Sequence, residues 1–274
     1  MTRDISVREV TCSSVLRRFN SYSRHRYTAN FYRGCLHGCA YCYAPSLTRD
    51  ERPWGSYVDV KVNSPQVLRR ELAKLEKGPV FLSSASDPYQ AVEAKYRITR
   101  TCLQELLRHD FPVTILTRSP LVLRDIDLFR QFSTIFVGCS ISGWSGTEAE
   151  MYVPGLEARI RTLRKLSDKG ITTWVSLAPL IPVKLADKLD ELLIKLKEAG
   201  VKYVSPGMLR FDGYERSARN FSHFGLTEIN RSDAHESLIH ALRMVAEAGL
   251  STILPVTATG AANNTLDRFL SAEP

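Results

Sequence analysis

Residues 78–119 read GPVFLSSASDPYQAVEAKYRITRTCLQELLRHDFPVTILTRS and contain one complete strand, helix and strand unit. The short apolar run at 79–83 predicts a buried strand, and the β-branched run at 112–117 predicts a second one. Between them, residues 98–108 carry apolar side chains three and four positions apart, which predicts a helix. This order predicts two parallel strands joined by a right-handed crossover.

The same alternation continues to residue 255. Strands are predicted at 134–141, 171–177, 201–205 and 251–255, and helices at 121–132, 157–169, 184–198 and 232–248. Repeated units of this length indicate an α/β fold of parallel strands, either an open sheet or a full or partial barrel. In both architectures ligands bind at the carboxyl ends of the strands.

Small polar residues follow the predicted strands one after another. Candidates for a ligand site at these strand ends are Ser84, Asp87, Arg118, Ser140 and Ser142. Turn formation alone favours such residue types, but five strand ends in register predict a polar pocket at one end of the sheet. Alternation along 136–142 places Gly138, Ser140 and Ser142 on one face of the strand and Cys139 on the other, toward the helices.

Composition narrows the class of protein. The 274-residue chain is 44 % hydrophobic, and no apolar run approaches the ~20 residues needed to cross a bilayer. We therefore expect a globular protein without a membrane span. The first ten residues lack the apolar centre of a secretory signal, so the six cysteines need not form disulfides. A cytoplasmic location is expected.

The net charge of +8 is concentrated near the start of the chain. Residues 1–33 contain seven Arg against two acidic residues, with five aromatic residues between them. Such a mixture can follow a phosphate backbone and stack on bases, whereas a solvated arm whose aromatics pack on the body is the alternative. We divide the chain into a basic arm (1–29), a barrel (30–213) and a C-terminal extension packing on the barrel (214–274).

A cluster of cysteines is the most specific feature. Cys35, Cys39 and Cys42 form a CxxxCxxC spacing within RGCLHGCAYCY at residues 33–43. Three thiolates this close can converge on one soft-metal centre. A structural zinc site needs four closed ligands, whereas a 4Fe-4S cluster held by three cysteines leaves one iron open to a cofactor. His37 could instead complete a zinc site, which would indicate a non-catalytic zinc and nucleic-acid-binding protein.

The spacing, interrupted by Tyr41 and followed by Tyr43, resembles the signature of the radical SAM superfamily. Within it the chain is similar to the spore photoproduct lyase and DNA repair photolyase-like family. The similarity is carried by NFYRGC at 30–35, SASDPY at 84–89, TRSPLVLRD at 117–125 and APLIP at 178–182. It implies a partial (β/α)6 barrel of parallel strands with helices outside, the cluster loop after the first strand, and a short C-terminal extension.

This resemblance also implies a chemistry. A 4Fe-4S cluster on Cys35, Cys39 and Cys42 would reductively cleave S-adenosylmethionine to a 5′-deoxyadenosyl radical, which abstracts hydrogen from an organic substrate. An external electron donor of the flavodoxin or ferredoxin type is implied. The substrate expected from the resemblance is a nucleobase, a nucleoside or a nucleic acid.

Roles for the other site residues follow from the same resemblance. Tyr41 would lie against the adenine, and Arg118 would bind the methionyl carboxylate. The strand-end residues that would face the cofactor are Ser84, Asp87, Ser140 and Ser142. A packing aromatic is the alternative for Tyr41, and a surface ion pair is the alternative for Arg118.

One departure from the family concerns the end of the reaction. Ser84 stands where spore photoproduct lyase carries the cysteine that returns a hydrogen atom to the product radical. Cys12, Cys102 and Cys139 are expected to be buried or incidental thiols, so we expect no cysteine hydrogen donor. A biosynthetic radical SAM enzyme acting on a small metabolite is therefore the alternative among enzymes.

Overall fold

The computed structural model describes residues 4–19, 25–48, 50–82, 84–143, 145–180, 182–208 and 231–255. Of the predicted C-terminal extension, only residues 231–255 fall within these ranges. No helix in the described ranges has the length and apolar character needed to span a bilayer.

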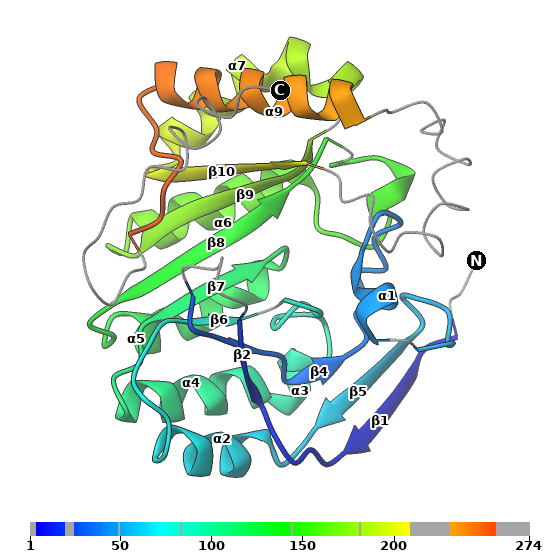
Figure 1. Ribbon diagram of the computed structural model, residues 1–274, viewed down its shortest axis with the longest axis vertical. Helices are drawn as coiled ribbons and strands as arrows, with labels where there is room; N and C mark the ends of the chain where they lie inside the picture. Colours follow the sequence, from blue (N-terminus) through cyan, green and yellow to red (C-terminus); the bar gives the residue numbers. More distant parts are fainter. Residues whose placement is uncertain are drawn as a thin grey trace.

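A seven-stranded sheet is the centre of the fold, in the order β10-β9-β8-β7-β6-β3-β2 (Figure 1). Its strands are β2 (Leu16–Arg18), β3 (Tyr27–Ala29), β6 (Val80–Leu82), β7 (Val113–Thr117), β8 (Ile135–Ile141), β9 (Thr172–Leu180) and β10 (Tyr203–Met208). The six strands from β3 to β10 run parallel, and β2 is antiparallel to β3. The predicted α/β fold with a partial barrel of six parallel strands is confirmed.

Helices cover the outer face of this sheet. They are α2 (Ser64–Leu72), α3 (Glu93–Tyr96), α4 (Ile98–Arg108), α5 (Ile126–Phe129), α6 (Leu156–Ser167), α7 (Pro182–Glu198) and α9 (Arg231–Glu247). Figure 1 shows α7 and α9 beside β10 at one end of the sheet and α2 with α4 toward the other. Alternate strand residues fill two apolar cores under these helices, one around α2 and α4 and the other around α6, α7 and α9.

The predicted basic arm is partly built into sheets. β1 (Ser6–Val10) pairs in parallel with β5 (Tyr57–Lys61), and β4 (Tyr32–Arg33) pairs antiparallel with β5 in a second, three-stranded sheet. β2 and β3 belong to the main sheet. All three residues of β3 are buried, so this short strand opens the barrel before residue 30 despite the charge around it. The cysteines follow β3, as expected, and α1 (Ala44–Thr48) follows the cysteines.

Two predicted elements differ from the structure. In place of one helix at 121–132, the chain forms the 3₁₀ helix η1 (Pro120–Asp125) and then the short α5. A 3₁₀ turn places residues three apart on one side, so that Val122 and Asp125 are both fully buried. The expected strand at 251–255 is reduced to a single bridge between Ser251 and Tyr203.

The inner face of the barrel is aromatic toward the amino-terminal ends of strands β8, β9 and β10. Phe136 and Trp174 are buried there, and Phe81 and Tyr203 pack against them. The Trp174 indole Nε1 donates a hydrogen bond to the carbonyl of Ile115 at 3.1 Å, so the ring is held across the inside of the sheet. Gly138 makes room for it: a Cβ at this position would stand 2.4 Å from the Trp174 ring.

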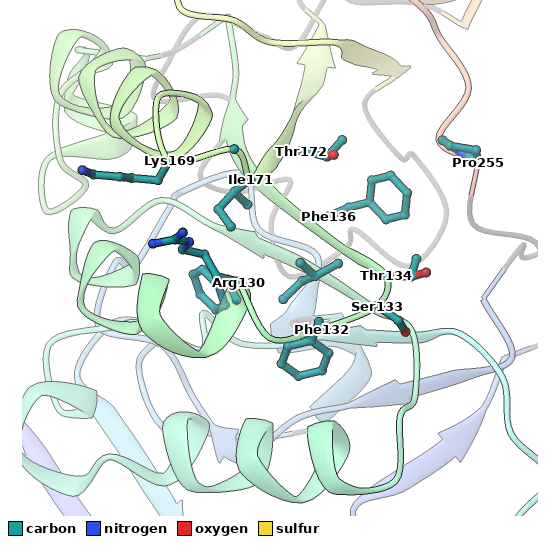
Figure 2. A pocket seen from close by; sticks show the side chains of 12 residues that line it. Arg130, Phe132, Ser133, Thr134, Phe136, Lys169, Ile171, Thr172 and Pro255 are labelled. Atoms are coloured by element: carbon teal, nitrogen blue, oxygen red, sulfur yellow. The ribbon is translucent and has the colours of Figure 1, made fainter.

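A hollow of about 520 Å³ lies at the amino-terminal ends of the strands, where β8 and β9 begin (Figure 2). Phe136 and Thr172 line it from these two strands, and Arg130 and Lys169 extend from the preceding loops. This hollow is separate from the carboxyl ends of the strands, where the candidate site lies.

Replacement of Gly138 by Ala is expected to lower the free energy of unfolding by about 1–3 kcal/mol, because the new methyl group must displace the Trp174 ring. Urea unfolding measures the change. Gly155→Ala is the matched control, since a Cβ there meets no atom within 4 Å. Equal stability of both variants would show that the ring moves freely.

Candidate functional site

The three cysteines lie on an irregular segment, residues 34–43, which we call the cysteine loop. Two turns shape it, because the Gly38 N–H donates to the Cys35 carbonyl at 3.2 Å and the Cys42 N–H donates to the Cys39 carbonyl at 3.1 Å. Gly34 opens the loop with a φ of +85°, and a Cβ there would stand 2.4 Å from a backbone oxygen of Tyr57. Only glycine fits this position.

The segment after β6, residues 84–90, holds the cysteine loop. The Gln90 side chain accepts from the Leu36 N–H at 3.0 Å and donates to the Gly34 carbonyl at 3.2 Å. Gln90 is fully buried, and the sequence analysis missed it. Tyr43 adds a hydrogen bond from its hydroxyl to the Ser84 carbonyl. The loop therefore gains side-chain partners in place of a strand ladder.

Asp87 is the central hydrogen-bond acceptor where the segment 84–90 contacts the cysteine loop. One carboxylate oxygen accepts from the Tyr89 N–H at 2.8 Å and from the Thr117 hydroxyl at 2.6 Å. The other accepts from the Arg118 N–H at 2.8 Å and lies 3.3 Å from Nδ1 of His37. The predicted cofactor residue Asp87 thus directs both oxygens toward protein groups, and the His37 imidazole faces Asp87.

The opposite charges of His37 and Asp87 keep both side chains ionised although burial opposes it. Burial lowers the pKa of His37, but the Asp87 carboxylate and the nearby Cys35 sulfur raise it overall to about 10. Burial also opposes ionisation of Asp87, yet His37 and the hydrogen bonds from Thr117 and Arg118 hold the pKa of this carboxyl below its usual range. The loop is therefore fastened by an ion pair.

Ser84 stands apart from these contacts. Its hydroxyl oxygen accepts hydrogen bonds from the Thr28 hydroxyl and from the Asn30 amide, both at 2.8 Å. Asn30 also accepts from the Ala85 N–H at 2.8 Å. Ser84 therefore joins the ends of β3 and β6.

A second carboxylate, Glu150, connects the cysteine loop to β8. Glu150 lies in the 3₁₀ helix η2 (Glu148–Glu150) and accepts from the Tyr41 hydroxyl and from the Ser142 hydroxyl, the latter at 2.7 Å. Arg159 on α6 donates to its other oxygen at 2.6 Å and to the carbonyl of Ser140 at 2.8 Å. Burial raises the pKa of the Tyr41 hydroxyl well above its usual value.

Glu150 and Arg159 were also missed in the sequence. A signal existed, because Arg159 occupies a position on the apolar stripe of α6 together with Ile160 and Leu163. A charged residue on a buried stripe requires a buried partner of opposite charge. The buried partner of Arg159 is Glu150. Burial raises the pKa of Glu150, but Arg159 and Arg118 hold this pKa below its usual range, so the side chain is a carboxylate.

Arg118 follows β7 directly and reaches the same place. Its guanidinium carbon lies 6.0 Å from the centre of the Tyr41 ring, and its Nη2 lies 3.5 Å from the Tyr41 hydroxyl. The Nε atom is buried without a hydrogen-bond partner. Such a cation suits a carboxylate ligand, which can accept two parallel hydrogen bonds.

The thiols share a buried environment. Burial raises the pKa of Cys39 to about 11 and that of Cys42 to about 12; neighbouring thiols add to both effects, and Arg118 opposes them. Among the described residues, no three His, Cys, Asp or Glu side chains already stand in an arrangement that holds a metal ion. The donor set itself fits an iron–sulfur cluster, since three soft ligands share one short, buried loop beside a cation.

The other cysteines lie elsewhere. Cys102 packs in the core around α2 and α4, and Cys139 packs under α6, the side of β8 predicted from alternation. None of the six cysteines, all within the described ranges, forms a disulfide.

Of the predicted site residues, the structure brings Tyr41, Arg118 and Ser142 together around Glu150.

Comparisons with known proteins agree with this geometry. The family model of the Radical SAM superfamily matches residues 29–191. An uncharacterized protein of Methanocaldococcus jannaschii is 38 % identical over 162 residues, which cover 57 % of this chain and 61 % of that protein. A protein of Pseudomonas phage M6 named radical SAM Nα-GlyT isomerase is 26 % identical over 183 residues, 63 % of this chain and 38 % of the phage protein.

Among solved structures, spore photoproduct lyase with bound S-adenosylmethionine and a dinucleoside spore photoproduct superimposes with a TM-score of 0.70. The match covers 88 % of this chain and 79 % of that one, at 15 % identity. This likeness establishes a common fold.

The His37–Asp87 pair predicts a pH dependence of stability in the metal-free protein. Between pH 6.5 and 8.5 the folded state keeps a proton on His37 that the unfolded state releases, because the pKa rises from 6.5 to about 10 on folding. The free energy of unfolding should therefore fall by about 2–3 kcal/mol across these two pH units. Urea unfolding under reducing conditions measures it.

His37→Gln is the control for this prediction. The variant should be less stable at pH 6.5 and should show a flatter dependence on pH, because no imidazole remains at this position. The window ends below the ordinary thiol pKa of 9, so the cysteines contribute little. Identical slopes in both proteins would contradict the assignment.

Proposed function

The chain belongs to the radical SAM superfamily, and we propose that it cleaves S-adenosylmethionine reductively at a 4Fe-4S cluster held by Cys35, Cys39 and Cys42. The observation that carries the proposal is the position of the cysteine loop beside Arg118, a buried cation with an unused donor. When bound, the cluster supplies one electron that breaks a carbon–sulfur bond of S-adenosylmethionine, giving methionine and a 5′-deoxyadenosyl radical. An external electron donor of the flavodoxin or ferredoxin type would supply that electron.

The residues around the cysteine loop have separate tasks in this proposal. Arg118 binds the methionyl carboxylate through its guanidinium fork. The Tyr41 ring lies against the adenine, and Ser140 and Ser142 line the wall of β8. Asp87 acts through His37 and Arg118 by holding both in place, and Ser84 supports the loop from the end of β6.

The barrel protects the reaction from water. A primary carbon radical takes hydrogen from any suitable group it meets, so the substrate must enter a closed, dry space. The aromatic inner face around Trp174 and Phe136 supplies such a surface below the site. Cys102 and Cys139 are buried in the cores outside the barrel wall, so we propose that the reaction proceeds without a cysteine hydrogen donor.

We propose that the substrate is a nucleobase, a nucleoside or a nucleic acid. The phage relative is named radical SAM Nα-GlyT isomerase, and the structure with the similar fold, spore photoproduct lyase, contains a bound dinucleoside spore photoproduct. On this chain, the exposed Arg17 and Arg18 of β2 present positive charge at one edge of the main sheet. Arg26 is already paired with Glu76 at 2.5 Å.

Replacement of Cys39 by Ala tests the activity. After anaerobic loading with iron and sulfide, we expect the parent to carry about four irons and to release 5′-deoxyadenosine with a reductant, whereas Cys39→Ala loses both, because a three-thiolate site has no spare ligand. Cys139→Ala is the matched control, since this thiol lies under α6. A colourless parent that binds zinc, or full turnover by Cys39→Ala, would contradict the proposal.

Replacement of both Arg17 and Arg18 by Ser tests the nucleic-acid substrate. Each lost phosphate contact should reduce the slope of log K against log salt by about 0.7–0.9, so the slope of the variant should be smaller by up to about 1.8. Arg161→Ser with Arg164→Ser on the exposed face of α6 is the charge-matched control. A parent without salt-dependent binding would favour a small metabolite as substrate.

A further inference from the structure

The described residues contain two buried triads of the same chemistry. In the first, Tyr41 and Arg159 both donate to Glu150. In the second, the Tyr32 hydroxyl donates to Glu93, and Arg124 donates to the same carboxylate at 2.6 Å. Both carboxylates are buried, with 4 % exposure for Glu150 and none for Glu93.

The triads differ in what else they contact. Glu93 accepts further hydrogen bonds from the backbone at the start of α4, including the Thr99 N–H at 3.0 Å, and Arg124 continues to Asp125 at 2.8 Å. That triad fastens helices to one another. Glu150 instead accepts from Ser142, and its arginine donates to the carbonyl of Ser140, so the first triad ends at the candidate site.

We infer that Glu150 is the positioning residue that sets the Tyr41 ring and the Ser142 hydroxyl for binding of S-adenosylmethionine; this inference rests on the proposed function. Tyr41 lies between two of the cysteines on a loop without a strand ladder, so the hydrogen bond of its hydroxyl to Glu150 fixes the position of the far end of its ring. The Ser142 hydroxyl donates to the same carboxylate, so Glu150 also fixes the direction of this hydroxyl.

The charge of Glu150 supports the same role. This one carboxylate lies between two arginines and is bonded to Arg159 by a 2.6 Å ion pair. Arg118 acts on Glu150 through charge without a hydrogen bond to it, and its Nε has no partner. One positive charge therefore remains uncompensated within this group. That excess is suited to the carboxylate of an amino-acid ligand, and Glu150 keeps Arg159 from competing for it.

Glu150→Gln and Glu93→Gln form the matched experiment. Each removes a buried carboxylate that is ion-paired with an arginine, so both should destabilise the metal-free protein in urea unfolding, although Arg124 keeps its pair with Asp125. Only Glu150→Gln should weaken equilibrium binding of S-adenosylmethionine to the cluster-loaded protein, by about tenfold. Equal affinities in the parent and in Glu150→Gln, or equal losses in both variants, would overturn the inference.

A second readout uses the metal-free protein alone. If Glu150 tethers the cysteine loop through Tyr41, Glu150→Ala, which removes the acceptor of the Tyr41 hydroxyl, should speed the labelling of the loop cysteines by a thiol reagent several-fold relative to Glu93→Ala. Labelled positions are identified by peptide mass analysis. Equal labelling rates in the two variants would show that the tether does not hold the loop.

Tyr41→Phe and Tyr32→Phe carry the test if Glu150→Gln does not fold, because each removes one hydroxyl and keeps the ring. Only Tyr41→Phe should weaken binding of S-adenosylmethionine and speed thiol labelling. The double variant Tyr41→Phe with Glu150→Ala, where it folds, should bind no more weakly than Glu150→Ala, since both changes remove the hydrogen bond between Tyr41 and Glu150. Additive losses would contradict action through Tyr41.

These outcomes separate the two proposals. A cluster-loaded parent that does not bind S-adenosylmethionine overturns the proposed function and, with it, the role of Glu150 in binding. A parent that binds it while Glu150→Gln binds equally well overturns the positioning role alone.

Discussion

The turns of the cysteine loop satisfy only part of its backbone, and this constraint organises the surrounding structure. A segment that folds back so that three thiols lie close together has no helix or sheet ladder for its N–H and carbonyl groups. Gln90 takes up two of these groups, and the Asp87 carboxylate fixes His37 within the loop. Both anchors come from the segment after β6. They reach the cysteine loop because the parallel strands β3 and β6 end at the same edge of the sheet.

The same anchors determine the electrostatics of the site. Two carboxylates, Asp87 and Glu150, are buried among three cationic groups, namely His37, Arg118 and Arg159. Buried charges are costly unless they are paired, and each carboxylate has one close cationic partner. The Arg118 guanidinium is ion-paired with neither of these two carboxylates, and its Nε has no hydrogen-bond partner. The scaffold therefore provides a half-buried positive centre beside the thiols.

Function and support are divided between residues that look alike in the sequence. Ser84, Asp87, Ser140 and Ser142 all follow strands, yet the hydroxyl of Ser84 and the carboxylate of Asp87 are engaged by neighbouring strands and loops. Ser142 contacts Glu150 and faces the group formed by Tyr41 and Arg118. The wall of β8 therefore contributes most directly to the candidate site, whereas the end of β6 supports the loop.

The sequence by itself determined the α/β alternation, the parallel strands from residue 80 onward, the cysteine spacing and the direction of Cys139, because these depend on local periodicity and on neighbouring positions. It did not reveal the small sheet of β1, β5 and β4, in which the pairing of β1 with β5 joins residues about fifty positions apart. Nor did it reveal Gln90 or the pairing of Tyr41 with Glu150, which lie 109 residues apart. Polar residues carry no periodic signal for such contacts. Only the folded sheet, by bringing the ends of separate strands to one edge, decides which donor meets which acceptor.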